Sequence, residues 1–216
     1  MALPAFNEDG DLPPGVHGAT LSEMLDRFGQ GSFQRRAVAD RLNRLYQLAA
    51  STGKLARFVV FGSFVTAKAE PNDIDIILLM EDTFDLAAVT GEAALVFQHL
   101  EAHTRFGASV FWTRRSGGNG RRAGDDRILA GAPPRRSTRD CGDPAGGNMI
   151  ENDQQLQTTL ERIAWFQNQV AHLRQTETNP VNYRAAVSGF LAEIDRMQLE
   201  VREYLSFLPI ERERAA

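Results

Sequence analysis

The sequence predicts an α/β domain with a small mixed sheet, followed by a C-terminal α-helical hairpin. In the first half, two β-rich runs at residues 58–61 and 74–80 stand among segments with helical apolar spacing. In the last third, apolar residues follow a heptad-like spacing instead. A segment rich in arginine and glycine separates these parts, so the chain divides into residues 1–112, 113–148 and 149–216.

Two helices are expected before the first strand. Thr20 is a suitable N-cap, and Glu23, three residues later, completes a capping box for a helix that ends at Gly29. A second helix is predicted from Ser32 to Gly53, because its apolar residues recur every three or four positions.

Three strands and two further helical segments complete the predicted α/β domain. Residues 58–61 are the first strand, residues 74–80 are a second and more buried strand, and residues 109–112 are the third. Residues 64–69 are expected to form a short helix after the first strand. Residues 85–104 are expected to be helical before the third strand.

The middle segment, residues 113–148, has a different composition. It contains 8 Gly, 8 Arg and 3 Pro, and its only large aliphatic residues are Ile128 and Leu129. Such a segment cannot bury enough apolar surface to offset its ordering entropy, which predicts a disordered linker. A basic nucleic-acid tail is an alternative, but the segment lacks aromatic residues for base stacking. A further hypothesis is a frameshift that joined two overlapping genes, with Met149 as the start of the second.

The last third predicts two helices in an antiparallel hairpin or a coiled coil. Asn179 is a plausible N-cap for the second helix, and Pro180 occupies its first helical position. The same apolar seams allow a homo-oligomer to form through residues 149–208. The seam residues are Leu156, Leu160, Ile163, Val170 and Leu173 on the first helix, and Phe190, Ile194, Met197, Val201, Tyr204 and Leu208 on the second.

Composition narrows the class of protein. The net charge is −4 and the pI about 5.6, so a chain-wide basic footprint for nucleic acid is absent. No apolar run approaches the length of about 20 residues that spans a bilayer, and residues 1–9 do not read as a secretion signal. The single cysteine, Cys141, excludes an internal disulfide framework. These features predict a soluble cytoplasmic protein with no membrane partner.

One group of residues indicates a site that binds a metal and a phosphate. Gly62 and Ser63 follow the first strand, and Asp73 and Asp75 lie at the start of the second. Two carboxylates two positions apart on an extended segment point to one face and suit Mg²⁺, which binds a few carboxylates together with substrate phosphates. Glycine lets the backbone approach a phosphate, and the serine hydroxyl and following amides can bind its oxygens. The alternative is an ordinary turn that Asp73 caps.

A second, weaker candidate is a histidine pair. His99 and His103 lie one helical turn apart, a spacing that permits metal binding. No third ligand is apparent, so a solvated helix face is the favoured interpretation.

The pattern of Phe61-Gly62-Ser63 with Asp73-Ile74-Asp75 resembles the nucleotidyltransferase superfamily typified by DNA polymerase beta, and especially the minimal nucleotidyltransferases of bacteria. The resemblance covers residues 1–112. Other stretches look like a family of small bacterial proteins with this fold: Pro4-Ala5-Phe6, Leu12-Pro13-Pro14-Gly15-Val16-His17, Arg27-Phe28-Gly29 and Gly62-Ser63-Phe64-Val65-Thr66. Residues 149–208 look like a separate small helical protein.

The resemblance implies transfer of a nucleoside monophosphate from a nucleoside triphosphate to a hydroxyl of a protein, RNA or small molecule. ATP is the expected nucleotide, although another nucleoside triphosphate is allowed, and Mg²⁺ is the expected metal. Gly62 and Ser63 would lie at the triphosphate, and Asp73 and Asp75 would be the catalytic carboxylates that hold the metal.

The resemblance also implies a third acid, on a later strand, that activates the acceptor hydroxyl. Ser109 stands at the expected position, and serine is neither an equivalent base nor a metal ligand. Either Glu101, the nearest carboxylate upstream, substitutes for that acid, or catalysis is weak or lost. The alternatives are therefore a nucleotide-binding pseudoenzyme in a toxin–antitoxin-like pair, or a structural oligomer.

Overall fold

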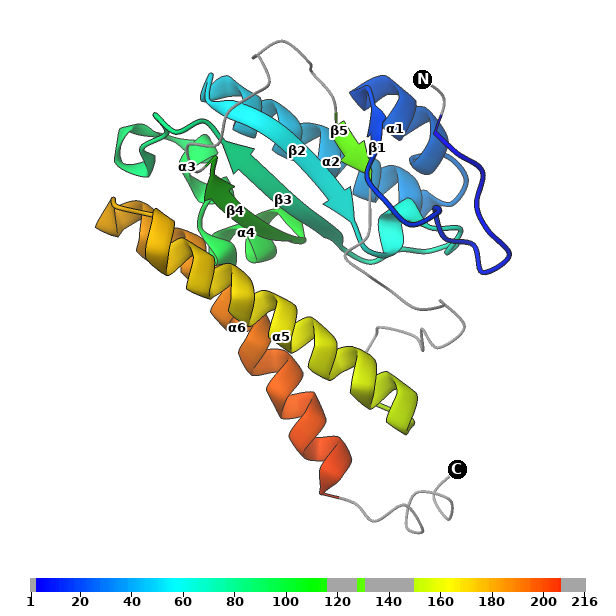
Figure 1. The fold of residues 1–216 in the computed structure, drawn as a ribbon. Coiled ribbons are helices and arrows are strands. Elements are labelled where there is room, and N and C mark those ends of the chain that lie inside the picture. Colours follow the sequence, from blue (N-terminus) through cyan, green and yellow to red (C-terminus); the bar gives the residue numbers. More distant parts are fainter. Residues whose placement is uncertain (1–2, 116–127, 131–149, 207–216) are drawn as a thin grey trace.

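The structure, a computed structural model, describes residues 3–115, 128–130 and 150–206. Its centre is a five-stranded sheet with the order β1-β5-β2-β3-β4 (Figure 1). The strands span His17–Ala19 (β1), Leu55–Phe61 (β2), Ile74–Met80 (β3), Ala108–Arg114 (β4) and Ile128–Ala130 (β5). The predicted combination of an α/β domain, a small mixed sheet and C-terminal helices is confirmed.

The sheet is mixed in strand direction. β2 runs antiparallel to β3, whereas β4 runs parallel to β3. β5 pairs in parallel with β2 and antiparallel with β1. The end of β2, the start of β3 and the start of β4 therefore lie at one edge of the sheet, where the candidate site residues are found.

The first two helices form as their capping signals predict. α1 spans Leu21–Phe28, and Thr20 and Glu23 make both hydrogen bonds of the capping box. α2 spans Phe33–Ser51, and the hydroxyl of Ser32 accepts a hydrogen bond from the backbone N–H of the third helical residue. Both predicted helices are confirmed.

The single helical segment expected at 85–104 is divided into three pieces. They are a 3₁₀ turn at Leu86–Ala88 (η2), a short helix at Glu92–Val96 (α3) and a helix at His99–Phe106 (α4). Gly91 interrupts the helix between η2 and α3, because its φ of 66° is a left-handed value that favours glycine. Gln98 has extended backbone angles and interrupts the helix between α3 and α4.

The C-terminal helices form the predicted hairpin. α5 spans Asp153–Thr176 and α6 spans Pro180–Leu205, and the two pack along each other. The side chain of Asn179 accepts hydrogen bonds from the first N–H groups of α6, and Pro180 begins that helix, as predicted.

The prediction of a linker that is disordered throughout was wrong at residues 128–130. These residues form β5, whose backbone pairs with β1 and β2 at the same time. The average composition of the segment concealed Ile128 and Leu129, a short apolar run that strand pairing can use. Residues 113 and 114 also continue β4. Residues 116–127 and 131–149, with the remaining linker and frameshift hypotheses, lie outside the described part of the chain.

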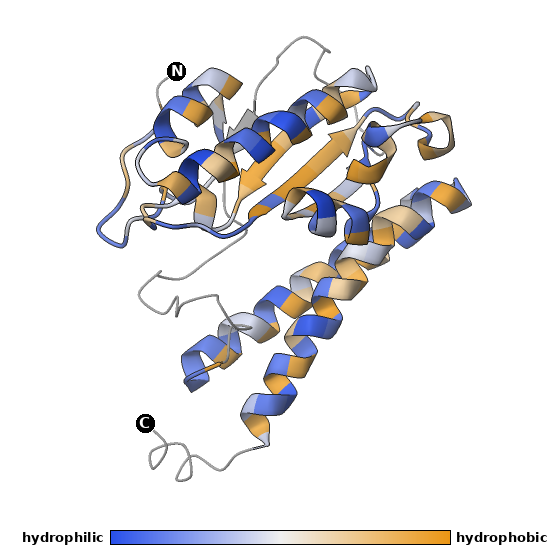
Figure 2. Cartoon of the chain, turned by 180° about the vertical axis from the view of Figure 1, so that it is seen from behind, coloured by the Kyte–Doolittle hydropathy of each residue, from blue (hydrophilic) through white to orange (hydrophobic). Residues whose placement is uncertain are grey.

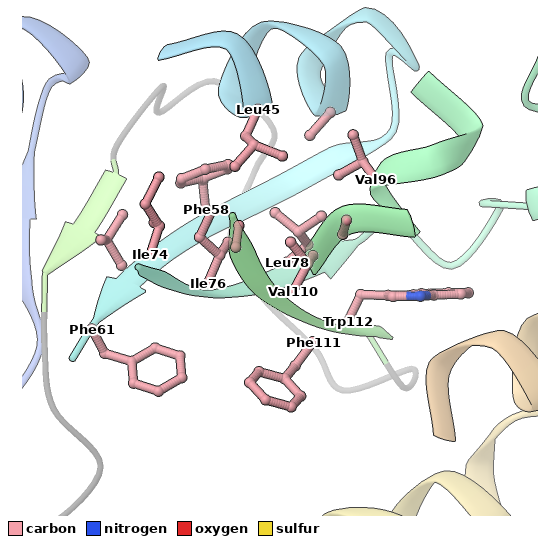
Figure 3. Packing of buried hydrophobic residues seen from close by; sticks show 14 of the residues in the cluster. Leu45, Phe58, Phe61, Ile74, Ile76, Leu78, Val96, Val110, Phe111 and Trp112 are labelled. Atoms are coloured by element: carbon pink, nitrogen blue, oxygen red, sulfur yellow. The ribbon is translucent and has the colours of Figure 1, made fainter. Parts of the chain in front are cut away.

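One face of the sheet packs against α2 and the segment from α3 to α4. Figure 3 shows Leu45 and Phe58 on this side, with Phe61 and Phe111 on the other. The strands are the most apolar part of the domain, whereas the outer surface of α2 is mainly hydrophilic (Figure 2). The central side chains on this face are almost completely inaccessible: Leu42, Leu45, Phe58, Val60, Ile76, Leu78 and Trp112.

The hairpin packs against the opposite face of the sheet (Figure 1). The ring of Phe111 on β4 lies 5.2 Å from the ring centroid of Phe166 on α5 and 5.2 Å from that of Phe190 on α6. Phe61 lies 6.3 Å from Phe111 on the same face. This aromatic cluster joins the hairpin to the sheet in one continuous hydrophobic core.

Polar contacts fix the start of α6 to the sheet and to the segment that follows β3. The fully buried amide of Asn182 donates to the carbonyl of Phe84 at 3.0 Å and accepts from the N–H of Leu86 at 2.9 Å. Arg114, at the end of β4, forms a two-pronged ion pair with Glu177 before α6, with distances of 2.7 and 2.5 Å. These contacts set the position at which α6 begins to cross the sheet.

We expect Asn182→Ala to loosen the hairpin from the sheet. The substitution leaves a buried carbonyl and a buried N–H without partners, which costs about 1–3 kcal/mol for each group. Thermal unfolding and hydrogen exchange of the α6 amides measure the loss. Asn168→Ala, at an exposed position of α5, is the matched control. Equal stability of the two variants would contradict the role given to Asn182.

None of the helices in the described residues has both the length and the apolar character that a bilayer crossing requires.

Candidate functional site

Gly62 and Asp75 meet at the end of β2. The backbone of Gly62 has φ 78° and ψ −161°, angles that side-chain-bearing residues rarely adopt. A Cβ atom at Gly62 would lie 2.0 Å from Oδ2 of Asp75, so the carboxylate occupies the space that a side chain would need. The pairing of Phe61 with Asp75 across β2 and β3 produces this approach. The structure therefore brings together two of the four predicted site residues directly.

The loop after Gly62 is tighter than the sequence predicts. In place of a helix over 64–69 there is one 3₁₀ turn, Ser63–Val65 (η1). The N–H and the hydroxyl of Thr66 both donate to the carbonyl of Ser63, at 3.3 and 2.8 Å. The Ser63 hydroxyl itself makes no hydrogen bond to any other described residue, so it is open to a ligand.

A buried arginine on α2 fixes the conformation of the loop that follows Ser63. Arg35 on α2 is 8% exposed and has no carboxylate partner among the described residues. Its guanidinium donates to the backbone carbonyls of Phe28, Phe64, Thr66 and Lys68 at 2.8, 3.1, 2.6 and 3.0 Å. Burial lowers the pKa of this group. The carbonyls stabilise the charge, and the guanidinium in turn fixes the path of the chain after Ser63.

The structure places the other residues considered in the sequence at different distances from Gly62 and Asp75. Asp73 immediately precedes β3 and is partly exposed. Parallel pairing of β3 with β4 places Ser109, which stands where the resemblance implies a third acid, directly next to Asp75. Glu101 is bound to Arg105 on the exposed side of α4, at 2.8 Å. Within the described ranges, no three histidine, cysteine or acidic side chains gather to hold a metal ion.

Two carboxylates are nevertheless compatible with magnesium. Mg²⁺ is commonly held by one or two protein carboxylates, with water and substrate phosphates as its other ligands. Asp73 and Asp75 supply hard oxygen donors, and the carboxylate of Asp75 lies directly against the backbone of Gly62. The donor set at this edge therefore fits Mg²⁺ bound together with a polyphosphate.

The favoured interpretation of the two histidines was half correct. His103 is exposed, as a solvated helix face requires. His99 instead packs against the ring of Phe111, 5.9 Å away between ring centroids, and against Gly189 of α6. Burial lowers the pKa of His99, and the nearby backbone of Val110 opposes that shift. His99 therefore belongs to the contact between α4, β4 and the hairpin.

The structure adds a charged group that sequence reasoning missed. Arg196 on α6 hydrogen-bonds Glu193 at 3.0 and 2.5 Å and also Glu200. The hydrogen bond to Glu193 raises the pKa of Arg196, and the charge of Asp75 adds to that rise. Burial raises the pKa of Glu200. The spacing of Glu193, Arg196 and Glu200 indicates ion pairs along a helix, but only the docking of the hairpin brings Arg196 within range of the charge of Asp75.

A family match covers most of the α/β domain and continues through β5. The family carries the description "Family of unknown function (DUF6932)", and the match spans residues 4–140. The chain belongs to this family. The DUF6932 match includes the candidate site and ends before α5 and α6. No curated protein and no solved structure matches the chain significantly.

Proposed function

We propose that this DUF6932 protein is a Mg²⁺-dependent nucleotidyltransferase. It transfers a nucleoside monophosphate from a nucleoside triphosphate, with ATP the first candidate, to a hydroxyl of a protein, RNA or small molecule. The observation that carries the proposal is the contact of Gly62 with Asp75. It joins a loop suited to phosphate with a carboxylate suited to the metal, at one edge of a mixed sheet.

Asp73 and Asp75 would hold Mg²⁺, which supplies charge neutralisation and orientation of the triphosphate when it is bound. Gly62 has no side chain, so the carboxylate of Asp75 lies directly against the backbone of the loop that would bind the triphosphate. The hydroxyl of Ser63 donates to a phosphate oxygen. Arg35 keeps both groups in place by fixing the loop that follows them.

The reaction would form one bond and break one. The acceptor oxygen attacks the α-phosphorus, the bond from that phosphorus to the bridging oxygen breaks, and pyrophosphate leaves. The acceptor proton must also depart. Ser109 beside Asp75 cannot accept it as a carboxylate does, so the proton passes to water, and we expect slow transfer.

Ser109 also favours a second candidate function. A nucleotide-binding pseudoenzyme needs the phosphate loop and the metal carboxylates but not the third acid. Such a protein would bind Mg²⁺-ATP without turnover, and the hairpin against the same face of the sheet would act as its partner or regulator. A structural oligomer built on the hairpin, the third option, predicts no nucleotide binding.

Mg²⁺-dependent ATP binding tests the site. We expect Asp73→Asn and Asp75→Asn each to weaken ATP binding by about tenfold or more, which corresponds to about 1.4 kcal/mol. The reason is loss of a negatively charged metal ligand in each variant. Isothermal titration calorimetry with and without Mg²⁺ measures the effect. Asp40→Asn, which makes the same charge change at an exposed position of α2, should bind as the wild type does. Unchanged binding in both site variants would reject the assigned roles.

A further inference from the structure

The path of α6 leads from the far end of β4 toward the candidate site. The segment before α6 binds Arg114 at the end of β4 through Glu177. Further along the helix, Phe190 packs on Phe111, three residues earlier in β4. α6 therefore runs antiparallel to β4, and its later turns approach the strand start, where Ser109 pairs with Asp75.

The contact between α6 and β4 is close. A Cβ atom at Gly189 would lie 3.3 Å from the carbonyl oxygen of Val110 and 3.0 Å from Nδ1 of His99. Glycine at this position lets the helix backbone lie directly on the strand. From Phe190, six more residues advance the helix to Arg196 by about 9 Å in the direction of the start of β4.

The guanidinium of Arg196 keeps N–H donors that an anion could use. Arg196 remains 42% exposed although it binds Glu193 and Glu200. Those hydrogen bonds use three of its five N–H donors among the described residues. They also hold the guanidinium in one orientation, which reduces the entropy lost when it binds a ligand. The charge of Asp75 acts on the same guanidinium.

We propose that Arg196 binds the phosphate groups of the nucleotide and thereby completes, from the hairpin, a site whose carboxylates lie on β3. A planar guanidinium with two donors to spare matches the oxygens of a polyphosphate. The inference rests on the proposed function and deepens it. Residue 196 lies outside the family match, which ends at residue 140, so this part of the site belongs to the hairpin of this chain.

Binding of Mg²⁺-ATP to the full chain tests the role of Arg196. We expect Arg196→Met to raise the Kd for Mg²⁺-ATP about tenfold or more, and Arg196→Lys to raise it less. Inorganic tripolyphosphate, used as a competitor, should lose affinity by a similar factor, because the lost contact is to phosphate. Circular dichroism and the unfolding temperature check that both variants are folded.

The matched control is Arg162→Met. Arg162 on α5 lies 3.7 Å from Glu193, so its loss removes the same charge from the same ion-pair cluster. We expect less than a threefold change in Kd for this variant. Equal weakening in both methionine variants would overturn the proposal by assigning the effect to net charge, and unchanged binding in Arg196→Met would overturn it directly. If the wild type itself binds no Mg²⁺-ATP, the proposed function fails, and this inference fails with it.

Discussion

Gly62→Ala is expected to abolish Mg²⁺-ATP binding, because the new methyl group and the carboxylate of Asp75 cannot share one position. The Cβ would lie 2.0 Å from Oδ2, 2.9 Å from Cγ and 3.2 Å from Cβ of Asp75. All three atoms belong to the short side chain of a residue in a paired strand, so Asp75 must turn away or the strands must separate. The backbone angles of Gly62 add a further cost of about 1–3 kcal/mol for alanine.

Gly53→Ala separates the effect of the clash with Asp75 from the effect of the positive φ. Gly53 also has a positive φ, 63°, but its added Cβ would meet no atom within 4 Å. We expect this control to lower the unfolding temperature moderately and to leave nucleotide binding intact. Calorimetric titration of both variants, below their unfolding temperatures, gives the comparison. Wild-type affinity in a folded Gly62→Ala protein would show that the position of Asp75 beside Gly62 is not required.

Arg35→Met is expected to cause the largest loss of stability, about 3–5 kcal/mol, which lies at the upper end for single substitutions. The guanidinium makes charge-assisted hydrogen bonds to carbonyls of the loop after Ser63 and of the end of α1. Methionine fills much of the same volume but donates nothing, so these buried carbonyls lose their partner. We also expect weaker ATP binding, because the loop that presents Ser63 is no longer fixed.

Arg36→Met is the control for this prediction. Arg36 is the next residue of α2, is exposed and donates to the carbonyl of Gly31. We expect a change within about 0.5 kcal/mol, as for most surface substitutions. Chemical denaturation of both variants measures the difference. A loss of similar size in the two variants would show that Arg35 has no special role beneath the loop.

Local signals in the sequence predicted most of the elements. Thr20, Ser32 and Asn179 are residues whose side chains satisfy the first N–H groups of a helix, so each marks a start that the neighbouring chain alone decides. The strands β2, β3 and β4 were predicted from short apolar runs rich in residues that favour strands. The break of the 85–104 helix depends on local backbone angles at Gly91 and Gln98 that composition does not reveal.

Long-range contacts could not be predicted in this way. β5 is three residues long and forms only because β1 and β2 offer two open edges, which are distant in sequence. Phe190 reads as an ordinary member of a helix–helix seam, yet its ring also packs on Phe111 of the sheet. Nothing in the local sequence distinguishes these two environments, so the docking of the hairpin was not foreseen.

The candidate site likewise contains residues that local sequence signals predict and residues that depend on long-range contacts. The spacing of Gly62, Ser63, Asp73 and Asp75 could be recognised in the sequence, because the loop and the strand carry them within 14 residues. The position of Ser109 was implied by the resemblance, which places a third acid on a later strand, and the register places Ser109 beside Asp75. Arg35 and Arg196 could not be found from the sequence, since each acts through a contact made by another part of the chain.

Transfer of label from ATP tests the central claim most directly. The purified full-length protein is incubated with Mg²⁺, ATP labelled at the α-phosphate and a cell lysate that supplies acceptors, beside the Asp73→Asn/Asp75→Asn double variant. We predict label on an acceptor with the wild type and none with the double variant. Bound ATP without any transferred label, or equal label with both proteins, would contradict nucleotidyl transfer at this site.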